Sequence, residues 1–156
     1  MFTGGLSEAQ PGFSALPAVN TEVTQIAATL PTTQLLNHTF TTERLRDTLS
    51  DIPFSVVHLA THGQFSSRAE DTFLVTWDGR INVQDLDALL QPRGRDPKQP
   101  LELLVLSACQ TATGDKRAAL GLAGIALRSG ARSTLATLWQ VNDESTSTLM
   151  VEFYQQ

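Results

Sequence analysis

The chain has 156 residues, of which 41% are hydrophobic and 17% charged, and its formal net charge is -5. This size and apolar content predict one globular domain with a single core, spanning residues 1–156. The negative net charge and the lack of a dense run of Lys or Arg argue against a protein that binds nucleic-acid phosphates directly.

Hydropathy and cysteine content exclude further classes. No apolar run approaches the ~20 residues that a membrane helix needs, and the N-terminus lacks the basic start and apolar stretch of a secretory signal. We therefore expect a cytoplasmic protein that does not engage a membrane. The lone cysteine, Cys109, cannot form an internal disulfide, and one thiol with scattered histidines makes a poor zinc site. We expect no metal and no cofactor.

The first 19 residues are rich in Gly and Pro, which predicts irregular structure with at most a short strand. Apolar residues then recur at helical spacing from Asn20, a plausible N-cap, until Pro31 ends the pattern. A short strand over Gln34–Asn37 leads into a second helix, which Thr41 can cap. Leu45 and Leu49 would share the buried face of that helix.

The middle of the chain reads as a strand, a hairpin and a helix. Residues 55–60 (SVVHLA) are typical of a buried strand, and Thr61, His62 and Gly63 would follow in a loop. A hairpin is expected around Asp78-Gly79, because that pair supplies the positive φ that tight hairpin turns require. Asn82 could then cap a short helix through Leu90.

The last third repeats the strand and helix alternation. Residues 92–100 (PRGRDPKQP) read as an exposed loop, and residues 101–107 (LELLVLS) as a buried strand that delivers Cys109 at its C-terminal end. A helix over Ala118–Arg128, a strand over Ser133–Trp139 and a helix capped by Asn142 follow. Such alternation implies a mostly parallel sheet with helices on both faces and a site at the carboxyl ends of the strands.

Two predicted strands end in reactive groups, His62 and Cys109, which parallel strands would bring to the same edge of the sheet. A thiol is a weak nucleophile at neutral pH unless a neighbouring base favours the thiolate, and an imidazole can act as that base. Gly63 lets backbone N–H groups approach a substrate carbonyl, so the Gly63 and Cys109 amides could form an oxyanion hole. Cys109 lies 47 residues after His62, close to the spacing of caspases.

Four segments together closely resemble CHAT domains, which are related to caspases, separases and gingipains. They are Val57–Gln64 (VHLATHGQ), Leu104–Asp115 (LVLSACQTATGD), Gly121–Ser133 (GLAGIALRSGARS) and Leu138–Thr146 (LWQVNDEST). The resemblance extends over nearly the whole chain. It implies an α/β fold, a caspase-like three-layer sandwich with a mostly parallel central sheet flanked by helices. Because family members usually continue beyond the last helix seen here, we expect the family's C-terminal elements to be missing.

The same resemblance implies a cysteine endopeptidase with His62 as general base, Cys109 as nucleophile, and Gly63 and Cys109 amides stabilising the oxyanion. Peptide bonds of a protein or peptide substrate would be hydrolysed through a thioester acyl-enzyme. A TPR-type or other regulatory module would be the partner. Arginine-cleaving relatives bind their substrate through an acidic group, which makes Asp71 and Asp115 candidate substrate-binding residues.

The same residues allow other interpretations. The chain could be a catalytically inactive interaction module that keeps the fold and signals by binding. Asp71, Asp115 and Asp143 could instead act as caps or turn residues. His58 is interpreted as a packing histidine that points away from His62.

Overall fold

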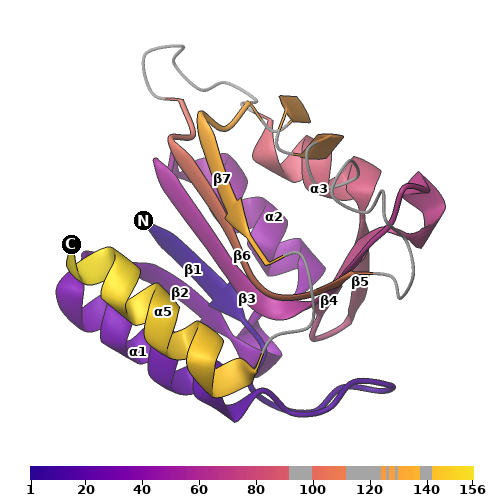
Figure 1. Cartoon of the computed structure of the whole chain (residues 1–156). Coiled ribbons are helices and arrows are strands. Elements are labelled where there is room, and N and C mark those ends of the chain that lie inside the picture. Colours follow the sequence, from indigo (N-terminus) through magenta and orange to yellow (C-terminus); the bar gives the residue numbers. More distant parts are fainter. Residues whose placement is uncertain (92–99, 112–123, 126, 129, 138–141) are drawn as a thin grey trace.

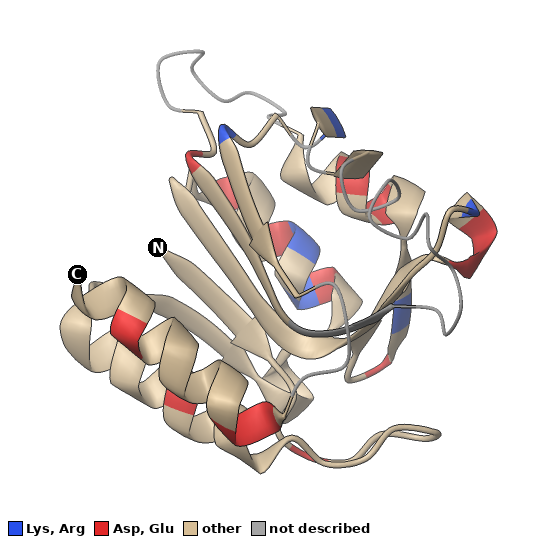
Figure 2. Cartoon of the chain, in the orientation of Figure 1, with Lys and Arg blue, Asp and Glu red and all other residues tan. Residues whose placement is uncertain are grey.

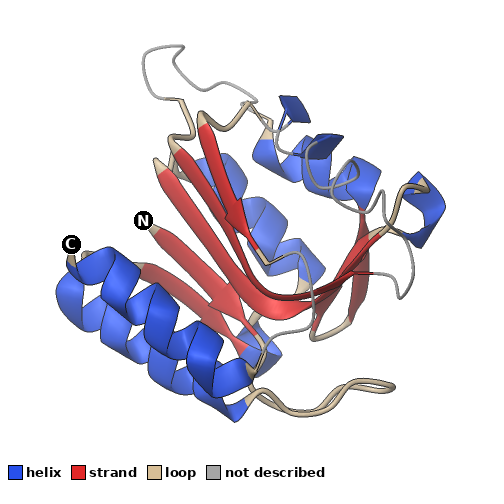
Figure 3. Ribbon diagram, viewed as in Figure 1, coloured by secondary structure: helices blue, strands red, loops and turns tan. Residues whose placement is uncertain are grey.

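The computed structural model describes residues 1–91, 100–111, 124, 125, 127, 128, 130–137 and 142–156, and for 108–111 it describes the backbone alone (Figure 1). A mostly parallel sheet lies between two layers of helices (Figure 3). The architecture is therefore the α/β sandwich predicted from the sequence, in a form consistent with the caspase-like fold.

Five strands form the parallel part of the sheet, in the spatial order β2-β1-β3-β6-β7. A hairpin of two further strands, β4 and β5, continues the sheet in antiparallel orientation from the C-terminal half of β3. The strands are β1 Phe2–Gly5, β2 Thr33–Leu36, β3 Val56–Phe65, β4 Phe73–Thr76, β5 Gly79–Asn82, β6 Leu103–Thr111 and β7 Ser133–Ala136.

Strand β3 lies in the middle of the sheet, where it pairs with three other strands, and it is longer than predicted. Its first half pairs with β1 over Val57–Ala60, its second half pairs with β4 at Gly63 and Gln64, and β6 runs along its other edge as far as Phe65. The prediction that Gly63 and its neighbour His62 lie in a loop is therefore wrong. Both lie inside the strand, because β4 and β6 continue the ladder beyond the end of β1.

Helices α1 (Pro17–Thr29) and α5 (Asp143–Gln155) lie side by side on one face of the sheet, and α2 (Thr42–Asp51) and α3 (Val83–Leu90) cover the other (Figure 1). The larger hydrophobic cluster includes the buried faces of α2 and α3. The predicted pair Leu45 and Leu49 belongs to it, with 0% and 4% of their surface exposed. No helix in the described part of the chain is long and apolar enough to cross a membrane.

Local capping signals predicted three helix starts correctly. The side-chain oxygens of Thr41, Asn82 and Asn142 each accept a hydrogen bond from the backbone N–H three residues later, at 3.3, 2.8 and 3.1 Å. The start of α1 was predicted wrongly, because the helix begins at Pro17 and contains Asn20. Proline suits the first helical turn, where its missing N–H costs nothing.

Two predicted features fall largely outside the described residues. These are the helix over Ala118–Arg128, of which 124, 125, 127 and 128 are described, and the loop beginning at Pro92. The strand predicted from Ser133 is confirmed as β7, which ends at Ala136.

The hairpin is confirmed, but the predicted turn chemistry is wrong. Thr76 pairs with Gly79 across the turn, and Gly79 does not have a positive φ. Instead, Oδ1 of Asp78 accepts hydrogen bonds from the Thr42 N–H at 2.9 Å and from the Thr76 hydroxyl at 2.9 Å. Partial burial alone would raise the pKa of Asp78, but these hydrogen bonds favour the carboxylate more strongly and hold the pKa below its usual value.

We predict that Asp78→Ala lowers the free energy of unfolding by about 1 kcal/mol at neutral pH, because Thr42, the first residue of α2, loses its acceptor. A lowered folded-state pKa means that the contribution is complete above about pH 4 and is lost as the pH falls through the folded value. Urea unfolding at about pH 7 and pH 2.5 checks this, with Asp78→Asn as the control that keeps an acceptor oxygen. An equal loss at both pH values would contradict the prediction.

Candidate active site

The two strands predicted to carry the reactive groups are neighbours in the sheet. Strands β3 and β6 run parallel, and their register places Gly63 directly opposite Cys109. Adjacent strands lie about 4.8 Å apart, so the backbone of Cys109 lies beside the residue that follows His62. The predicted convergence of the two segments at one edge of the sheet is thus present in the backbone.

The pairing of these strands is irregular at this place. Ala60 lies opposite Ser107 and Gly63 opposite Cys109, with a register shift between the two pairs. Between these two pairs, β3 has two residues, Thr61 and His62, where β6 has one, so β3 carries one extra residue here. Such bulges disrupt the ladder and redirect a side chain, and they are frequent beside active sites.

The His62 ring is held by the segment that leads into α1. Its Nε2 lies 2.7 Å from the backbone oxygen of Ser14, and its ring centroid lies 5.0 Å from that of Phe13. A carbonyl oxygen can only accept, so Nε2 must carry the proton in this hydrogen bond. In neutral His62 the lone pair is consequently on Nδ1, which becomes the atom able to act as a base.

A tight turn presents Ser14 and Phe13 to the histidine. The N–H of Phe13 donates to the Gln10 oxygen at 2.8 Å, with Pro11 and Gly12 at the corner and a φ of 83° at Gly12. Proline followed by a left-handed glycine is the pattern of a type II turn. The Pro-Gly pair in the sequence indicated this turn. Nothing in the sequence indicated that the backbone carbonyl of Ser14 would contact His62.

Packing favours glycine at position 63, because a larger residue would require the Leu74 side chain to shift. A Cβ on Gly63 would lie 2.6 Å from Cδ2 of Leu74, its partner on β4, and 3.3 Å from the Phe73 oxygen. Gly63 lies between β4 and β6, and a strand amide points toward one of its neighbouring strands. Gly63 is a ladder partner of Leu74 on β4 and of Cys109 on β6, directly after the register shift.

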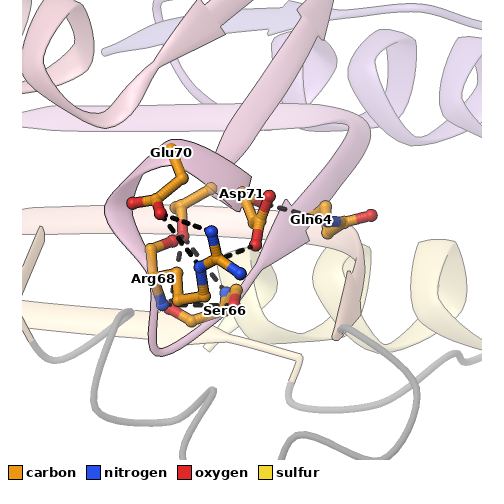
Figure 4. Close-up of polar contacts among 6 residues, drawn as sticks. Gln64, Ser66, Arg68, Glu70 and Asp71 are labelled. Carbon is orange, nitrogen blue, oxygen red and sulfur yellow. Dashed lines mark hydrogen bonds and ion pairs between the residues drawn. The ribbon is translucent and has the colours of Figure 1, made fainter.

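The acidic candidates do not form a joint pocket in the described residues. The Asp71 carboxylate lies 3.4 Å from Nε of Arg68, which also pairs with Glu70 at 2.7 Å (Figure 4). The backbone oxygen of Asp71 accepts from Gln64 Nε2 at 2.9 Å. Arg68 therefore offers one positive charge to two carboxylates, and the Asp71 carboxylate is engaged by it at the longer distance. Asp115 lies outside the described residues.

Asp143 acts as a cap, the alternative considered for it from the sequence. Its Oδ2 accepts a hydrogen bond from the Ala18 N–H in the first turn of α1 at 2.8 Å. Burial raises the pKa of Asp143 and outweighs this hydrogen bond, while Glu22 raises the pKa further and the charge of His62 lowers it. The first residue of α5 therefore lies within electrostatic reach of His62, which the sequence did not suggest.

A buried polar cluster lies beneath the site, between the sheet and helices α1 and α5. Oε1 of Glu22 lies 2.6 Å from His58 Nε2 and accepts from the Ser107 hydroxyl at 3.0 Å. His58 Nδ1 lies 3.0 Å from the Tyr154 hydroxyl. Glu22 and His58 are 1% and 0% exposed. Partial burial, with the Glu22 charge nearby, raises the pKa of Tyr154 above its usual value.

His58 is therefore the hydrogen-bonded packing histidine that was predicted. Its side chain faces α1 and α5, and His62 likewise contacts the segment entering α1, so the expectation that the two histidines point apart is wrong. The sequence did not predict the buried position of Glu22, because a single carboxylate on a helix is usually exposed to solvent.

Comparison with known proteins gives one clear result. The family model for the CHAT domain matches residues 4–156, nearly the full length of the chain. A search of the curated proteins finds no match.

Proposed function

Because the chain belongs to the CHAT domain family, whose relatives include the caspases, we propose that it is a cysteine endopeptidase. In this proposal His62 is the general base and Cys109 the nucleophile. The observation that carries it is the register of β3 and β6, which sets Cys109 opposite the residue after His62. The chemistry of the two side chains fits, because a thiol needs a nearby base to be nucleophilic at neutral pH.

The proposed reaction has two stages. Nδ1 of His62 takes the proton from the Cys109 thiol, and the thiolate attacks the carbonyl carbon of the scissile peptide bond. The Gly63 and Cys109 N–H groups would stabilise the oxyanion of the tetrahedral intermediate. Its collapse breaks the C–N bond, and the leaving amine takes the proton from His62. Water then attacks the thioester, giving its proton to His62, and the thiolate leaves.

The hydrogen bond from His62 to the Ser14 carbonyl is consistent with the proposed reaction. The carbonyl oxygen accepts from Nε2 at 2.7 Å, which keeps Nδ1 free for the thiol proton and stabilises the imidazolium when that proton arrives. The Asp143 carboxylate lies within electrostatic reach of the same ring, since the charge of His62 lowers the pKa of Asp143.

Cleavage of a peptide library by the wild type, Cys109→Ala and His62→Ala tests the proposal. Each variant is expected to lose at least about a thousandfold in kcat/KM, because the nucleophile and base act as one unit. His38→Ala is the matched control, since His38 is exposed and its ring lies 6.5 Å from that of Trp77. Equal cleavage by the wild type and Cys109→Ala would contradict the assignment.

Thiol reactivity separates a peptidase from an inactive interaction module. If His62 activates Cys109, iodoacetamide should alkylate the wild type well below pH 8.5, and His62→Ala should lose this advantage. The rate of peptide cleavage should also show a bell-shaped pH profile, because the thiol and imidazole titrate as a coupled pair. Alkylation that does not change in His62→Ala would favour the interaction module.

A further inference from the structure

A cavity lies between the β4–β5 hairpin and the turn that holds His62. It has a volume of about 320 Å³ and is lined by Gln10, Pro11 and Phe13 from the turn and by residues 75–80 of the hairpin. This volume is at the lower end of the range for small-ligand pockets and would accept a single large side chain. Phe13 and Trp77 supply aromatic surface to its lining.

Arg80 on β5 is the one positive charge in this lining, and it is held by aromatic rings. Its guanidinium carbon lies 4.2 Å from the ring centroid of Phe73 and 5.6 Å from that of Phe13. A guanidinium stacked on a ring is fixed in its plane while its N–H edge stays open, and that edge matches a carboxylate in bidentate geometry.

Within the described part of the chain, no neighbouring carboxylate matches the charge of Arg80. Among the described residues, no Asp or Glu oxygen lies within ion-pair distance of Arg80, as is also true of Arg44 and Arg46 on α2, whereas Arg68, Arg128 and Arg132 each have such a partner. The feature that distinguishes Arg80 is the pair of aromatic rings against its guanidinium. Asp78 is the one acid in the lining, and its Oδ1 accepts from Thr42 and Thr76. An exposed, pre-oriented arginine is therefore available at the cavity.

The cavity lies close to the catalytic candidates. The Phe13 ring that lines it is 5.0 Å from the His62 ring, so one aromatic side chain separates Arg80 from the histidine. An extended peptide covers this distance with about three residues, which span about 10 Å. On the other side of His62, α1 and α5 carry acidic residues and no basic ones, whereas β5 carries Arg80 (Figure 2).

From these contacts we infer that the cavity is a substrate subsite that binds an acidic side chain of the peptide through Arg80. The inference rests on the proposed peptidase function and names its substrate class, peptides with Asp or Glu within about three residues of the cleaved bond. It replaces Asp71 as the specificity candidate, because Asp71 is paired with Arg68, whereas Arg80 has aromatic partners and an open donor edge.

The test compares matched peptides that differ by Glu or Gln at single positions on each side of the cleaved bond. The wild type should cleave the Glu peptide about five- to tenfold better at one position, and Arg80→Gln should bring the ratio of Glu-peptide to Gln-peptide cleavage to about one. Arg80→Lys should restore part of it, because the charge remains without the planar donor edge. Arg132→Gln is the control, since Arg132 lies near the N-terminal end of β6 and pairs with Glu102.

Binding of the same fluorescent peptides, measured by anisotropy, separates the two proposals. If no peptide is cleaved, the peptidase proposal fails, but an Arg80-dependent preference for the Glu peptide in binding would still support the subsite. If the wild type neither cleaves nor binds the Glu peptide better than the Gln peptide, the subsite is wrong. A preference that persists unchanged in Arg80→Gln would also overturn it.

Discussion

Glu22→Ala is expected to lower the free energy of unfolding by about 3–5 kcal/mol, the largest change in stability that we predict for this chain. Glu22 is 1% exposed and is the shared acceptor for His58 Nε2 at 2.6 Å and the Ser107 hydroxyl at 3.0 Å. Without the carboxylate, a fully buried imidazole loses its closest partner and cannot recover it from water. The midpoint of urea unfolding measures the loss.

Two comparisons isolate the cause of this loss. Gln25→Ala, on the exposed side of the same helix, should stay within about 0.5 kcal/mol of the wild type. Glu22→Leu combined with His58→Phe should lose less than the sum of the single changes, because an apolar pair no longer contains an unmatched polar group. Strict additivity of the two substitutions would show that the Glu22–His58 contact contributes no coupling energy.

Gly5→Ala is expected to lower the free energy of unfolding by about 3 kcal/mol. The new Cβ would lie 2.5 Å from the backbone oxygen of Ala60 and 2.9 Å from Cγ1 of Val19. The Ala60 oxygen cannot move away easily, because it accepts a hydrogen bond from the Leu6 N–H at 3.1 Å. Strand β1 would have to separate from β3 two residues before His62, so the proposed peptidase activity should fall as well.

Gly79→Ala is the matched control for Gly5→Ala. Gly79 also lies in a strand, but no atom lies within 4 Å of its ideal Cβ and its φ is not positive. Its replacement should leave stability unchanged or raise it by a few tenths of a kcal/mol, since alanine has fewer unfolded conformations. Thermal or urea unfolding of both variants checks the pair, and a similar loss in both would show that strand propensity rather than the clash is responsible.

Features encoded by a few adjacent residues were predictable from the sequence. The caps Thr41, Asn82 and Asn142 are examples, because the donor that each one meets is three residues away. The order of strands and helices also followed from local patterns, and it led correctly to a mostly parallel sheet.

Features that depend on distant partners were not predictable. Strand β3 continues through His62 and Gly63 because β4 and β6 supply ladder partners there, and no local pattern reports them. Glu22 is buried because His58 and Ser107, 36 and 85 residues later, surround its carboxylate. The contact between Ser14 and His62 was unpredictable for another reason. It uses a backbone carbonyl, which every residue has, so no residue type signals it.

The pairing of α1 with α5 has a consequence for the newly made chain. Glu22 emerges from the ribosome long before Tyr154, which completes the cluster around His58. At about 5–20 residues per second, α1 waits on the order of ten seconds for its neighbour. During this interval the backbone N–H and carbonyl of Ala18, which later pair with Asp143 and Ser147, are open to water and to chaperones, and a chain that stops before α5 would leave them so.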